Sequence, residues 1–301
     1  MRIIFCSDYW NRNAPDAAYE AEAEVVRKLH LTYSLINVEA LMEQQNAARA
    51  VRNVEPAATQ EVAVYRGWML KPDVYERLYN ALAGKGLLLI NTPAAYMHCH
   101  YLPESYHLLA GMTPRSAWLK TGPVVSMDEV MAVLQQFGDR PVIVKDFVKS
   151  RKHEWREACY IPSAADRQAV ERVVTRFLEL QGADLNEGLV FREFLEFEPL
   201  TTHSKSGMPL IREFRLFVLD GQIILSTPYW EEGDYGNAAH TVLPLDAFTQ
   251  IAQKIQSRFF TLDVARKRNG TWNIVEPGDG QVAGLPAGAD VEAFYRALGR
   301  L

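Results

Sequence analysis

Short apolar runs and longer amphipathic segments alternate along the first 91 residues of the chain. The apolar runs have the length of strands and lie at residues 2–9, 32–38, 61–69 and 87–91. Two segments between them have helical spacing, at residues 14–29 and 71–86. Strands that alternate with helices in this way predict a parallel sheet covered by helices.

The pattern changes after a Gly-, Pro- and Ser-bearing stretch at residues 120–126, which is the best candidate for a domain boundary. Helical spacing recurs beyond it at residues 127–138, 164–182, 245–260 and 290–298. Strand patterns lie between these segments at residues 141–147, 188–195, 212–226 and 261–277. The last two are predicted hairpins, because Asp220-Gly221 and Asn269-Gly270 are turn sequences. The second half is therefore predicted to be α+β and rich in antiparallel strands.

Composition narrows the class of protein. Roughly half of the 301 residues are apolar, and no apolar run approaches the ~18 residues that a membrane-spanning helix needs. The chain therefore reads as soluble and globular, and its length predicts two or three packed units. An apolar strand follows Met1 directly, without the features of a secretory leader, which predicts a cytoplasmic protein.

Cysteine content and charge exclude further classes. The three cysteines are far apart and have no CxxC spacing, so we expect reduced thiols instead of disulfides or a zinc site. The net charge of −5 argues against a general nucleic-acid binder. His98, Cys99 and His100 belong to the sequence MHCH. We expect no zinc there, because their side chains would point to opposite sides of a strand or spread around a helix.

Residues 270–286 begin as a strand and end as a Gly-rich loop that carries Glu276 and Asp279. Two interpretations compete, a surface Asp-Gly turn and a metal site at a strand end. Asp263 favours the metal site, because the predicted hairpin places it on the neighbouring strand, roughly opposite Glu276. Two converging carboxylates repel unless a cation or a shared proton lies between them, and hard oxygen ligands suit Mg²⁺.

A basic segment follows the apolar strand at residues 141–147, which carries Lys145 near its end. The further basic residues are Lys149, Arg151, Lys152, His153 and Arg156. A solvated loop would explain these charges, and so would a phosphate site, because ammonium groups are suitable partners of phosphate oxygens. The position of Lys145 after so apolar a run favours the phosphate interpretation.

Two later strands carry charged residues within apolar sequence. Arg192 and Glu193 lie inside the strand at residues 188–195, where an edge strand with alternating faces is the simpler explanation. Glu213 and Arg215 project from one face of their strand, as the period-two geometry of strands requires. A salt bridge between them on a solvated face is one explanation, and a functional site is the other.

In this order the motifs resemble the ATP-grasp superfamily, and most closely its clade of uncharacterised proteins named for one arginine and two lysines. The resemblance covers about residues 88–286, whereas residues 1–87 match only as the α/β domain expected before it. More distantly, the chain is similar to ribosomal-protein glutamate ligases and glutathione synthetases. The implied fold is α/β plus α+β, with a parallel-sheet pre-ATP-grasp domain before a two-lobed ATP-grasp domain. The implied units are a pre-ATP-grasp domain at 1–120, a small lobe at 121–188 and a large lobe at 189–301.

The resemblance also implies how ATP would be bound. Lys145 and Lys149 would contact the phosphates, and Glu213 would contact the ribose. The hinge would bind adenine through the backbone of Glu193, Phe194 and Leu195. Arg215, together with Lys149 and Arg151 of the phosphate-covering loop, would act at the reacting phosphate. This loop lacks the glycines common in better-known members.

Mg²⁺ or Mn²⁺ is the implied metal, with Asp263, Glu276 and Asp279 as its ligands. The superfamily usually has asparagine two residues after the second acid, and this chain has Gly278 there. Asp279 or Gln281, or a water, must then supply the third oxygen.

The implied activity is that of an ATP- and Mg²⁺-dependent carboxylate–amine or carboxylate–thiol ligase that acts through an acyl phosphate. Its substrates would be small-molecule or peptide carboxylates and amines, without membrane or nucleic-acid partners. Arg66, at the end of a first-domain strand, is a candidate for holding the substrate carboxylate. The expected acceptor loop is residues 227–240, with Trp230, Glu231, Glu232, Asp234 and His240, and a plain polar loop is its other interpretation. A nucleotide-binding sensor or interaction module without ligase activity, a phosphotransferase of the same fold and an oligomeric state all stay open.

Overall fold

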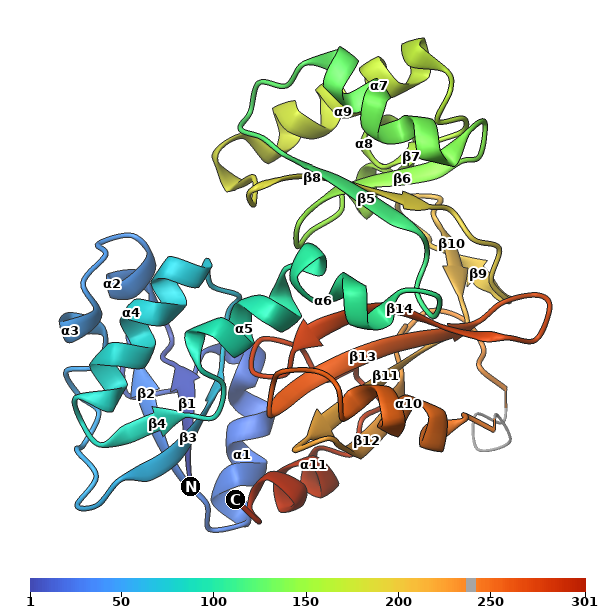
Figure 1. The fold of residues 1–301 in the computed structure, drawn as a ribbon. Helices are drawn as coiled ribbons and strands as arrows, with labels where there is room; N and C mark the ends of the chain where they lie inside the picture. The colour runs from blue at the N-terminus through green and yellow to red at the C-terminus, as the bar shows by residue number, and fades with distance from the viewer. Residues whose placement is uncertain (237–241) are drawn as a thin grey trace.

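The computed structural model describes residues 1–236 and 242–301, and it begins with a four-stranded parallel sheet (Figure 1). The strands are β1 Arg2–Cys6, β2 Thr32–Ile36, β3 Glu61–Arg66 and β4 Leu87–Leu89. Their order is β2-β1-β3-β4, and each pairing is parallel. The parallel sheet that was predicted from the alternation of strands and helices is therefore confirmed.

Both faces of this sheet are buried, because alternate side chains of β1 point to opposite faces. Ile4 and Cys6 pack in one core with the helices on one side, α2 Val38–Met42, α3 Ala47–Ala50 and α4 Pro72–Ala83. Ile3 and Phe5 pack in another core with the helices on the other side, α1 Glu20–Lys28 and α11 Val291–Leu298. Helix α11 is the last element of the chain, so both ends of the sequence meet in this second core.

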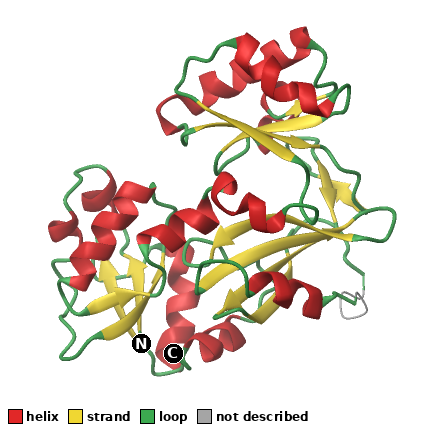
Figure 2. Cartoon of the chain, viewed as in Figure 1, coloured by secondary structure: helices red, strands yellow, loops and turns green. Residues whose placement is uncertain are grey.

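A second sheet forms the small lobe, at the top of Figure 1. Its strands are β5 Ser116–Lys120, β6 Val142–Asp146, β7 Tyr160–Ile161 and β8 Gly188–Glu193, in the order β5-β8-β6-β7. The helices of this lobe are α7 Met127–Leu134, α8 Trp155–Ala158 and α9 Arg167–Gln181. Helices α7 and α9 pack on the outer face of the sheet and leave its other face toward the rest of the molecule (Figure 2).

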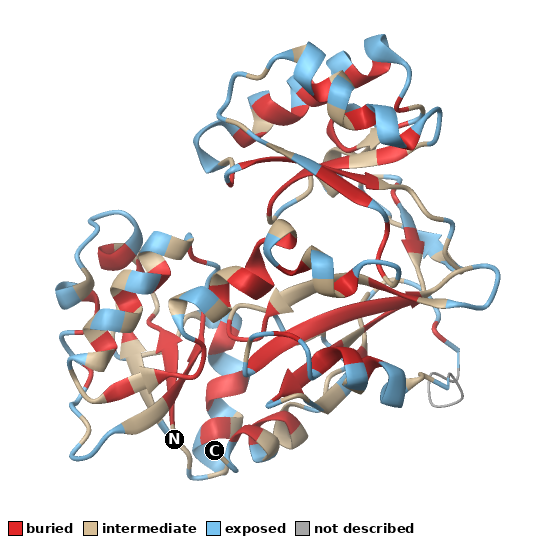
Figure 3. Cartoon of the chain, in the orientation of Figure 1, coloured by how far each residue is buried: buried red, intermediate tan, exposed pale blue. Residues whose placement is uncertain are grey.

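A third, antiparallel sheet forms the large lobe. Its strands are β11 Glu213–Leu219, β12 Gln222–Pro228, β13 Phe259–Arg266 and β14 Trp272–Asp279, in the order β12-β11-β13-β14. Strand β13 is buried along nearly its whole length (Figure 3). The two-residue turn between β11 and β12 has positive φ angles at Asp220 (48°) and Gly221 (74°), the geometry of the predicted hairpin.

Further elements connect these sheets. Helices α5 Pro93–His100 and α6 Leu102–Leu109 lead from the first sheet toward the second, and α10 Leu245–Ala252 covers the third. A small antiparallel pair, β9 Pro199–Thr202 and β10 Pro209–Ile211, follows β8. Short 3-10 helices lie at Ala17–Tyr19, Gln135–Phe137, Lys152–Glu154 and Gly182–Asp184. Among the described residues, no helix combines the length and apolar character needed to cross a membrane.

The N-terminal and large-lobe sheets share a hydrophobic core. Ile3 and Phe5 of β1 lie in one buried cluster with Phe217 of β11, Phe259 of β13 and Phe294 of α11. The rings of Phe217 and Phe294 meet edge to face, with their centroids 5.0 Å apart. The strands of the large lobe therefore pack directly against the first domain.

Two details differ from the sequence-based expectations. The helix predicted over residues 245–260 ends at Ala252, and Phe259 and Phe260 begin β13. A short run of buried apolar residues does not distinguish a helix from a strand, which explains the error. Residues 116–120 of β5, from the end of the first expected unit, pair with residues 188–192 of β8, at the border of the second and third expected units. The extents of the three units therefore stay a prediction.

Candidate active site

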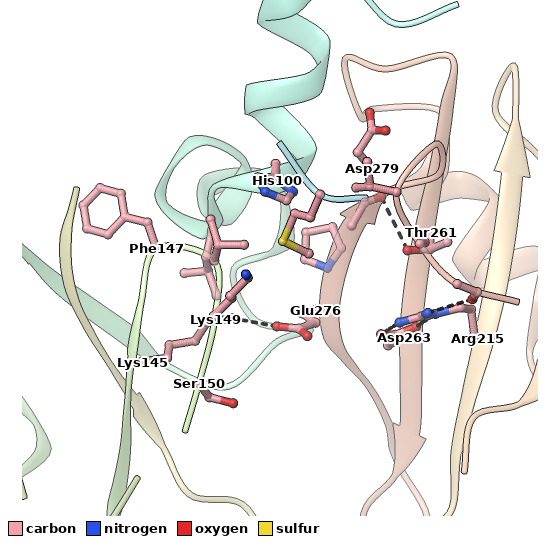
Figure 4. A pocket seen from close by; sticks show the side chains of 18 of the residues that line it. His100, Lys145, Phe147, Lys149, Ser150, Arg215, Thr261, Asp263, Glu276 and Asp279 are labelled. Atoms are coloured by element: carbon pink, nitrogen blue, oxygen red, sulfur yellow. Dashed lines mark hydrogen bonds and ion pairs between the residues drawn. The ribbon is translucent and has the colours of Figure 1, made fainter. Parts of the chain in front are cut away.

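A cavity of about 350 Å³ lies where the segment after β6 faces strands β13 and β14 (Figure 4). Its charged lining includes Lys145, Lys149, Lys152, Arg215, Asp263 and Glu276. Met69, from the loop after β3, and His100, from the end of α5, also line it. The cavity therefore lies where the small lobe, the large lobe and the N-terminal domain meet.

Asp263 and Glu276 face each other across the β13–β14 hairpin. They are direct register partners, as the predicted turn at Asn269-Gly270 requires. Asp263 is buried, whereas the side chain of Glu276 is 38% exposed and opens to the cavity. The strand pair thus holds two oxygen-rich groups side by side on the wall of the cavity.

Each of these carboxylates is paired with a basic side chain. The Arg215 guanidinium donates two hydrogen bonds to Asp263, of 2.8 and 2.7 Å, and the Lys145 ammonium lies 2.7 Å from Glu276. Burial alone would raise the pKa of Glu276, but Lys145 lowers it to about 2. Burial raises the pKa of Asp263 in spite of Arg215. The two acids are therefore neutralised separately, and they carry the hard oxygen donors that Mg²⁺ prefers.

Asp279 does not join them. Strand β14 continues as far as Asp279, and residues three apart on a strand point to opposite faces, so its carboxylate turns away from Glu276 (Figure 4). It accepts hydrogen bonds from the Asn91 amide (2.6 Å) and from the backbone N–H of Gln281 (2.9 Å). The prediction that a loop brings Asp279 to the metal assumed that the strand ends earlier.

Gln281 belongs to the same buried network as Asp279. Its side chain accepts from the backbone N–H of Tyr65 and donates to the hydroxyl of Tyr75, at 3.2 and 2.7 Å. Neither of the third oxygens that the sequence suggested on this segment is therefore free. Among the described residues, no group of three or more His, Cys, Asp and Glu side chains is arranged to hold a metal ion. The two facing carboxylates fit a cation that takes most of its ligands from water and phosphate, as Mg²⁺ does.

The basic loop after β6 is shaped by Asp146, which is fully buried. One carboxylate oxygen of Asp146 accepts from the backbone N–H groups of Val148 and Lys149, and the other accepts from Gln181 and Asn186. This turn directs Lys149 into the cavity (Figure 4).

The later basic residues of the loop differ in where they point. Lys152 lines the cavity, and its ammonium lies over the rings of Trp230 (4.7 Å) and Tyr229 (5.6 Å). Arg151, predicted to be catalytic, pairs with Glu154 at 3.4 Å and lines neither this cavity nor the one described next. Sequence spacing alone did not distinguish Arg151 from Lys152.

A second cavity, of about 180 Å³, continues the first, since Lys145, Lys152, Tyr229 and Glu276 line both. Its apolar lining includes Ile143, Trp155, Phe194, Leu195, Met208 and Ile211. The predicted hinge forms one wall: Glu193 pairs with Arg140 at 3.3 Å, and the Phe194 N–H donates to the Pro141 carbonyl. A polar, cationic cavity is therefore joined to an apolar one that is rich in aromatic residues.

Glu213 and Arg215 do not form the salt bridge that was one explanation of their spacing. Arg215 pairs with Asp263 instead, and its guanidinium lies 4.6 Å from the centre of the Tyr229 ring. Glu213 is buried in the wall of the second cavity, and burial raises its pKa well above the usual value. Both residues are thus part of the joined cavities, and neither lies on a solvated face.

Arg192 is a cavity residue whose importance the sequence did not reveal. It is 3% exposed and lines the second cavity, where its guanidinium donates to the hydroxyls of Ser116 and Thr113. Within residues 1–236 and 242–301, no carboxylate lies close enough to form an ion pair with it. A charged residue inside an apolar strand was the available signal, and alternating faces explained it equally well.

The two histidines of the MHCH sequence have different surroundings. His100 lines the cavity and stacks on Tyr96, with ring centroids 4.8 Å apart. Burial, together with Lys145 and Lys149, lowers the pKa of His100 to about 3, so its imidazole is neutral. His98 lines neither cavity.

Arg66 does not point into the cavity, so its predicted role with a substrate carboxylate is wrong. It is fully buried, donates to both carboxylate oxygens of Glu22, and donates to the carbonyls of Gly280 and Ala283. Burial at the contact with α11 and the 280–283 segment, which sequence position does not reveal, fixes Arg66 as a structural residue.

The expected acceptor loop is only partly described. Trp230 lines the second cavity, and Glu232 accepts hydrogen bonds from the backbone and the hydroxyl of Ser204. Glu231 and Asp234 line neither cavity, and His240 lies outside the described residues.

Among the solved structures with the same fold, three examples show the degree of similarity to this chain. The ATP-grasp ligase PsnB complexed with minimal precursor, Mg and ADP is 14% identical, with a TM-score of 0.57 over 99% of this chain and 96% of that one. The RimK domain protein ATP-grasp from Sphaerobacter thermophilus is 14% identical, with a TM-score of 0.55 over 100% and 95%. D-cycloserine synthetase DcsG is 14% identical, with a TM-score of 0.58 over 100% and 99%. At this identity the similarity establishes the fold.

The sequence itself was also compared with protein families. No curated protein sequence matches the chain. A family model for the ATP-grasp domain, R2K clade family 3, matches residues 136–298, a range that holds most of the residues lining the joined cavities. ATP and Mg²⁺ are typical ligands of this fold, and the structure of the ATP-grasp ligase PsnB contains Mg and ADP. The chain thus belongs to the ATP-grasp proteins of R2K clade family 3.

Proposed function

We propose that the chain binds ATP and Mg²⁺ in the two joined cavities and joins a carboxylate to an amine. The observation that carries this proposal is the arrangement around Asp263 and Glu276. Two facing carboxylates, each held by a cation, lie between a basic loop and an apolar, aromatic cavity. Membership in the ATP-grasp family supports the same conclusion.

The apolar cavity suits the adenosine part of ATP. Because the Phe194 N–H already donates to Pro141, the next hinge N–H, that of Leu195, is the donor left for a ring nitrogen of the base. Within the described residues, nothing accepts a hydrogen bond from it. Glu213 lies in the same cavity without an ion-pair partner among the described residues, and its carboxyl group suits the ribose hydroxyls.

The polar cavity suits the phosphates. Lys145, Lys149 and Lys152 line it, and ammonium groups are suitable partners of phosphate oxygens. We propose Lys152 for this role in place of Arg151. Mg²⁺ at Asp263 and Glu276 would neutralise phosphate charge. Arg215 would bind the transferred phosphoryl group, whose charge is spread over its oxygens during transfer.

The proposed reaction has two steps. A substrate carboxylate oxygen attacks the γ-phosphorus of ATP, the bond from that phosphorus to its bridging oxygen breaks, and ADP leaves. The amine nitrogen then attacks the acyl carbon, phosphate leaves, and the amine proton passes to solvent. The solved relatives include a ligase complexed with its minimal precursor and a D-cycloserine synthetase. Peptides and amino acids are therefore the first substrates to screen.

The test is incubation with ATP, Mg²⁺ and a mixture of amino acids and peptides, followed by assays of phosphate release and mass spectrometry. Phosphate release that requires both a carboxylate and an amine supports ligation. Phosphorylation of the acceptor would instead identify a phosphotransferase. Tight ATP binding without turnover on any mixture would identify a nucleotide sensor.

A pair of variants tests the nucleotide site separately from the chemistry. Lys145→Ala should weaken ATP binding by about tenfold or more, because one charge-assisted contact contributes about 1.5–3 kcal/mol. Arg151→Ala is the matched control, since Arg151 pairs with Glu154 and lines neither cavity. Calorimetric titration with ATP measures both, and equal losses would show a diffuse basic surface instead of a site.

A further inference from the structure

Thr261 and Gly278 form the next register pair on the same face as Asp263 and Glu276. Thr261 lies two residues before Asp263 on β13, and Gly278 lies two residues after Glu276 on β14. Residues two apart on a strand share one face, so all four positions face the cavity. Thr261 and Gly278 are indeed part of its lining, and Figure 4 shows Thr261 there.

The Thr261 hydroxyl fills the space that a side chain at position 278 would need. A Cβ atom placed on Gly278 would lie 2.9 Å from the Thr261 Oγ1, closer than such contacts occur. In the structure this hydroxyl makes one long hydrogen bond, of 3.4 Å, to the Gly278 carbonyl. Within the described residues this oxygen accepts no hydrogen bond, and it belongs to a cavity-lining residue two positions from Asp263.

The other oxygens considered for this place are occupied. Asp279 accepts from Asn91, and Gln281 is bound to Tyr65 and Tyr75. Thr261 is thus the side-chain oxygen on this strand pair that both faces the cavity and adjoins Asp263 and Glu276.

We propose that Thr261 supplies a third protein oxygen to the divalent cation, beside Asp263 and Glu276, and that Gly278 leaves room for it. This inference rests on the proposed function, because it requires the metal site. A neutral hydroxyl keeps the protein's contribution at two negative charges, which suits a cation that also binds the phosphates of a nucleotide.

Mn²⁺ titration followed by electron paramagnetic resonance, with ADP present, tests the proposal without any need for a substrate. Thr261→Val removes the oxygen and keeps the shape, and it should weaken Mn²⁺ binding about tenfold or more. Thr261→Ser keeps the oxygen and should stay within about twofold of the parent. Thr32→Val is the matched control, because Thr32 is a strand threonine of the first sheet, in β2, that lines neither cavity.

The outcomes separate this inference from the proposed function. If the parent with ADP binds no Mn²⁺, the proposed metal site is wrong. If the parent binds Mn²⁺ and Thr261→Val binds it equally well, the metal site stands and the role of Thr261 is refuted. Melting temperature and ADP affinity without metal are measured on each variant, and losses there as large as the loss of Mn²⁺ affinity would also refute a ligand role.

Exchange of the two positions gives an independent test. Gly278→Asn alone should lower the melting temperature, because its Cβ meets the Thr261 hydroxyl. Thr261→Ala combined with Gly278→Asn removes that contact and places an amide oxygen on the same face. The double variant should regain stability and bind Mn²⁺ more tightly than Thr261→Ala alone. Affinity no better than that of Thr261→Ala would contradict the shared position.

Discussion

Strand β14 carries two carboxylates three residues apart, and their environments are opposite. Glu276 opens to the cavity and pairs with Lys145, which lowers its pKa to about 2. Asp279 is 1% exposed, and burial raises its pKa to about 7 even though it accepts hydrogen bonds from Asn91 and Gln281. Asp279 also borders the cavity, but Asn91 and Gln281 hold its carboxylate, so the same strand contributes one acid that opens to the candidate site and one that is bound in the contact between domains. The difference arises from parity along the strand, since residues three apart face opposite ways.

The largest effect should come from the cavity side of this comparison. Glu276→Gln removes a charge from the proposed metal site and should lower Mg²⁺-dependent ATP turnover on the order of 10³-fold. EDTA should likewise abolish most of the thermal stabilisation that ATP gives the parent. Steady-state kinetics and melting curves measure both effects. A variant that binds MgATP and turns it over like the parent would show that Glu276 is not a metal ligand.

Arg215 is expected to contribute both to turnover and to stability. Arg215→Ala should lower kcat on the order of 10²-fold and affect ATP affinity less, because charge on the phosphoryl group is best recognised during transfer. It should also lower the free energy of unfolding by about 3–5 kcal/mol, since Asp263 is left buried and unpaired. Arg215→Lys should rescue poorly, because a lysine lacks the planar fork. Unchanged kcat with lowered stability would make Arg215 purely structural.

The buried side of the comparison should affect stability before chemistry. Asp279→Ala leaves the Asn91 amide and the Gln281 N–H without their acceptor and should cost about 1–3 kcal/mol of unfolding free energy per unsatisfied donor. Urea unfolding measures this cost. Turnover of the folded fraction should fall much less than in Glu276→Gln. An equal loss of turnover in both variants would show that Asp279 contributes to the active site as much as Glu276 does.

The pH dependence of stability should have opposite signs for the two acids. Asp279 has a folded-state pKa of about 7 against an ordinary 3.8, so its contribution to stability is greatest at low pH and is lost as the pH rises between these values. Glu276 has a lowered pKa, so its contribution is present above its ordinary value of 4.5 and is lost as the pH falls toward 2.

This smallest effect is measured as a difference in slope. Asp279→Asn should flatten the fall of unfolding free energy between about pH 4 and pH 7, by at most ~1.4 kcal/mol per pH unit. Urea unfolding of parent and variant at several pH values provides the comparison. Parallel curves would mean that Asp279 titrates near its ordinary value.

Local sequence patterns predicted most of the fold, because they depend on neighbours along the chain. The alternation of strands and helices gave the parallel sheet, and the Asn269-Gly270 turn placed Asp263 opposite Glu276. The same reasoning failed where strand length decided the direction of a side chain, as at Asp279. It also failed where a distant segment buried a charge, as at Arg66.

The residues that the sequence missed share a physical reason. Arg192 and Thr261 become notable only when strands distant in sequence are paired and a cavity forms in front of them. Lys152 and Arg151 are adjacent, and only the folded loop distinguishes them, since Lys152 lines both cavities and Arg151 lines neither. The spacing of residues along a strand predicts which side chains lie on the same face. Tertiary packing determines what that face contacts.

The network around Asp279 has a consequence for the exchange of domains. The segment at residues 279–283 is bound by Tyr65, Arg66, Tyr75 and Asn91 of the first domain, and it directly follows the part of β14 that carries the proposed metal ligand Glu276. A chimera that replaces the first domain to change substrate choice would leave this segment without its partners. Recombination, in the laboratory or in evolution, therefore has to transfer residues 279–283 together with the first domain. The segment after the proposed ligand Glu276 should therefore be inherited together with a distant part of the chain, as the 188-residue separation of Asn91 and Asp279 illustrates.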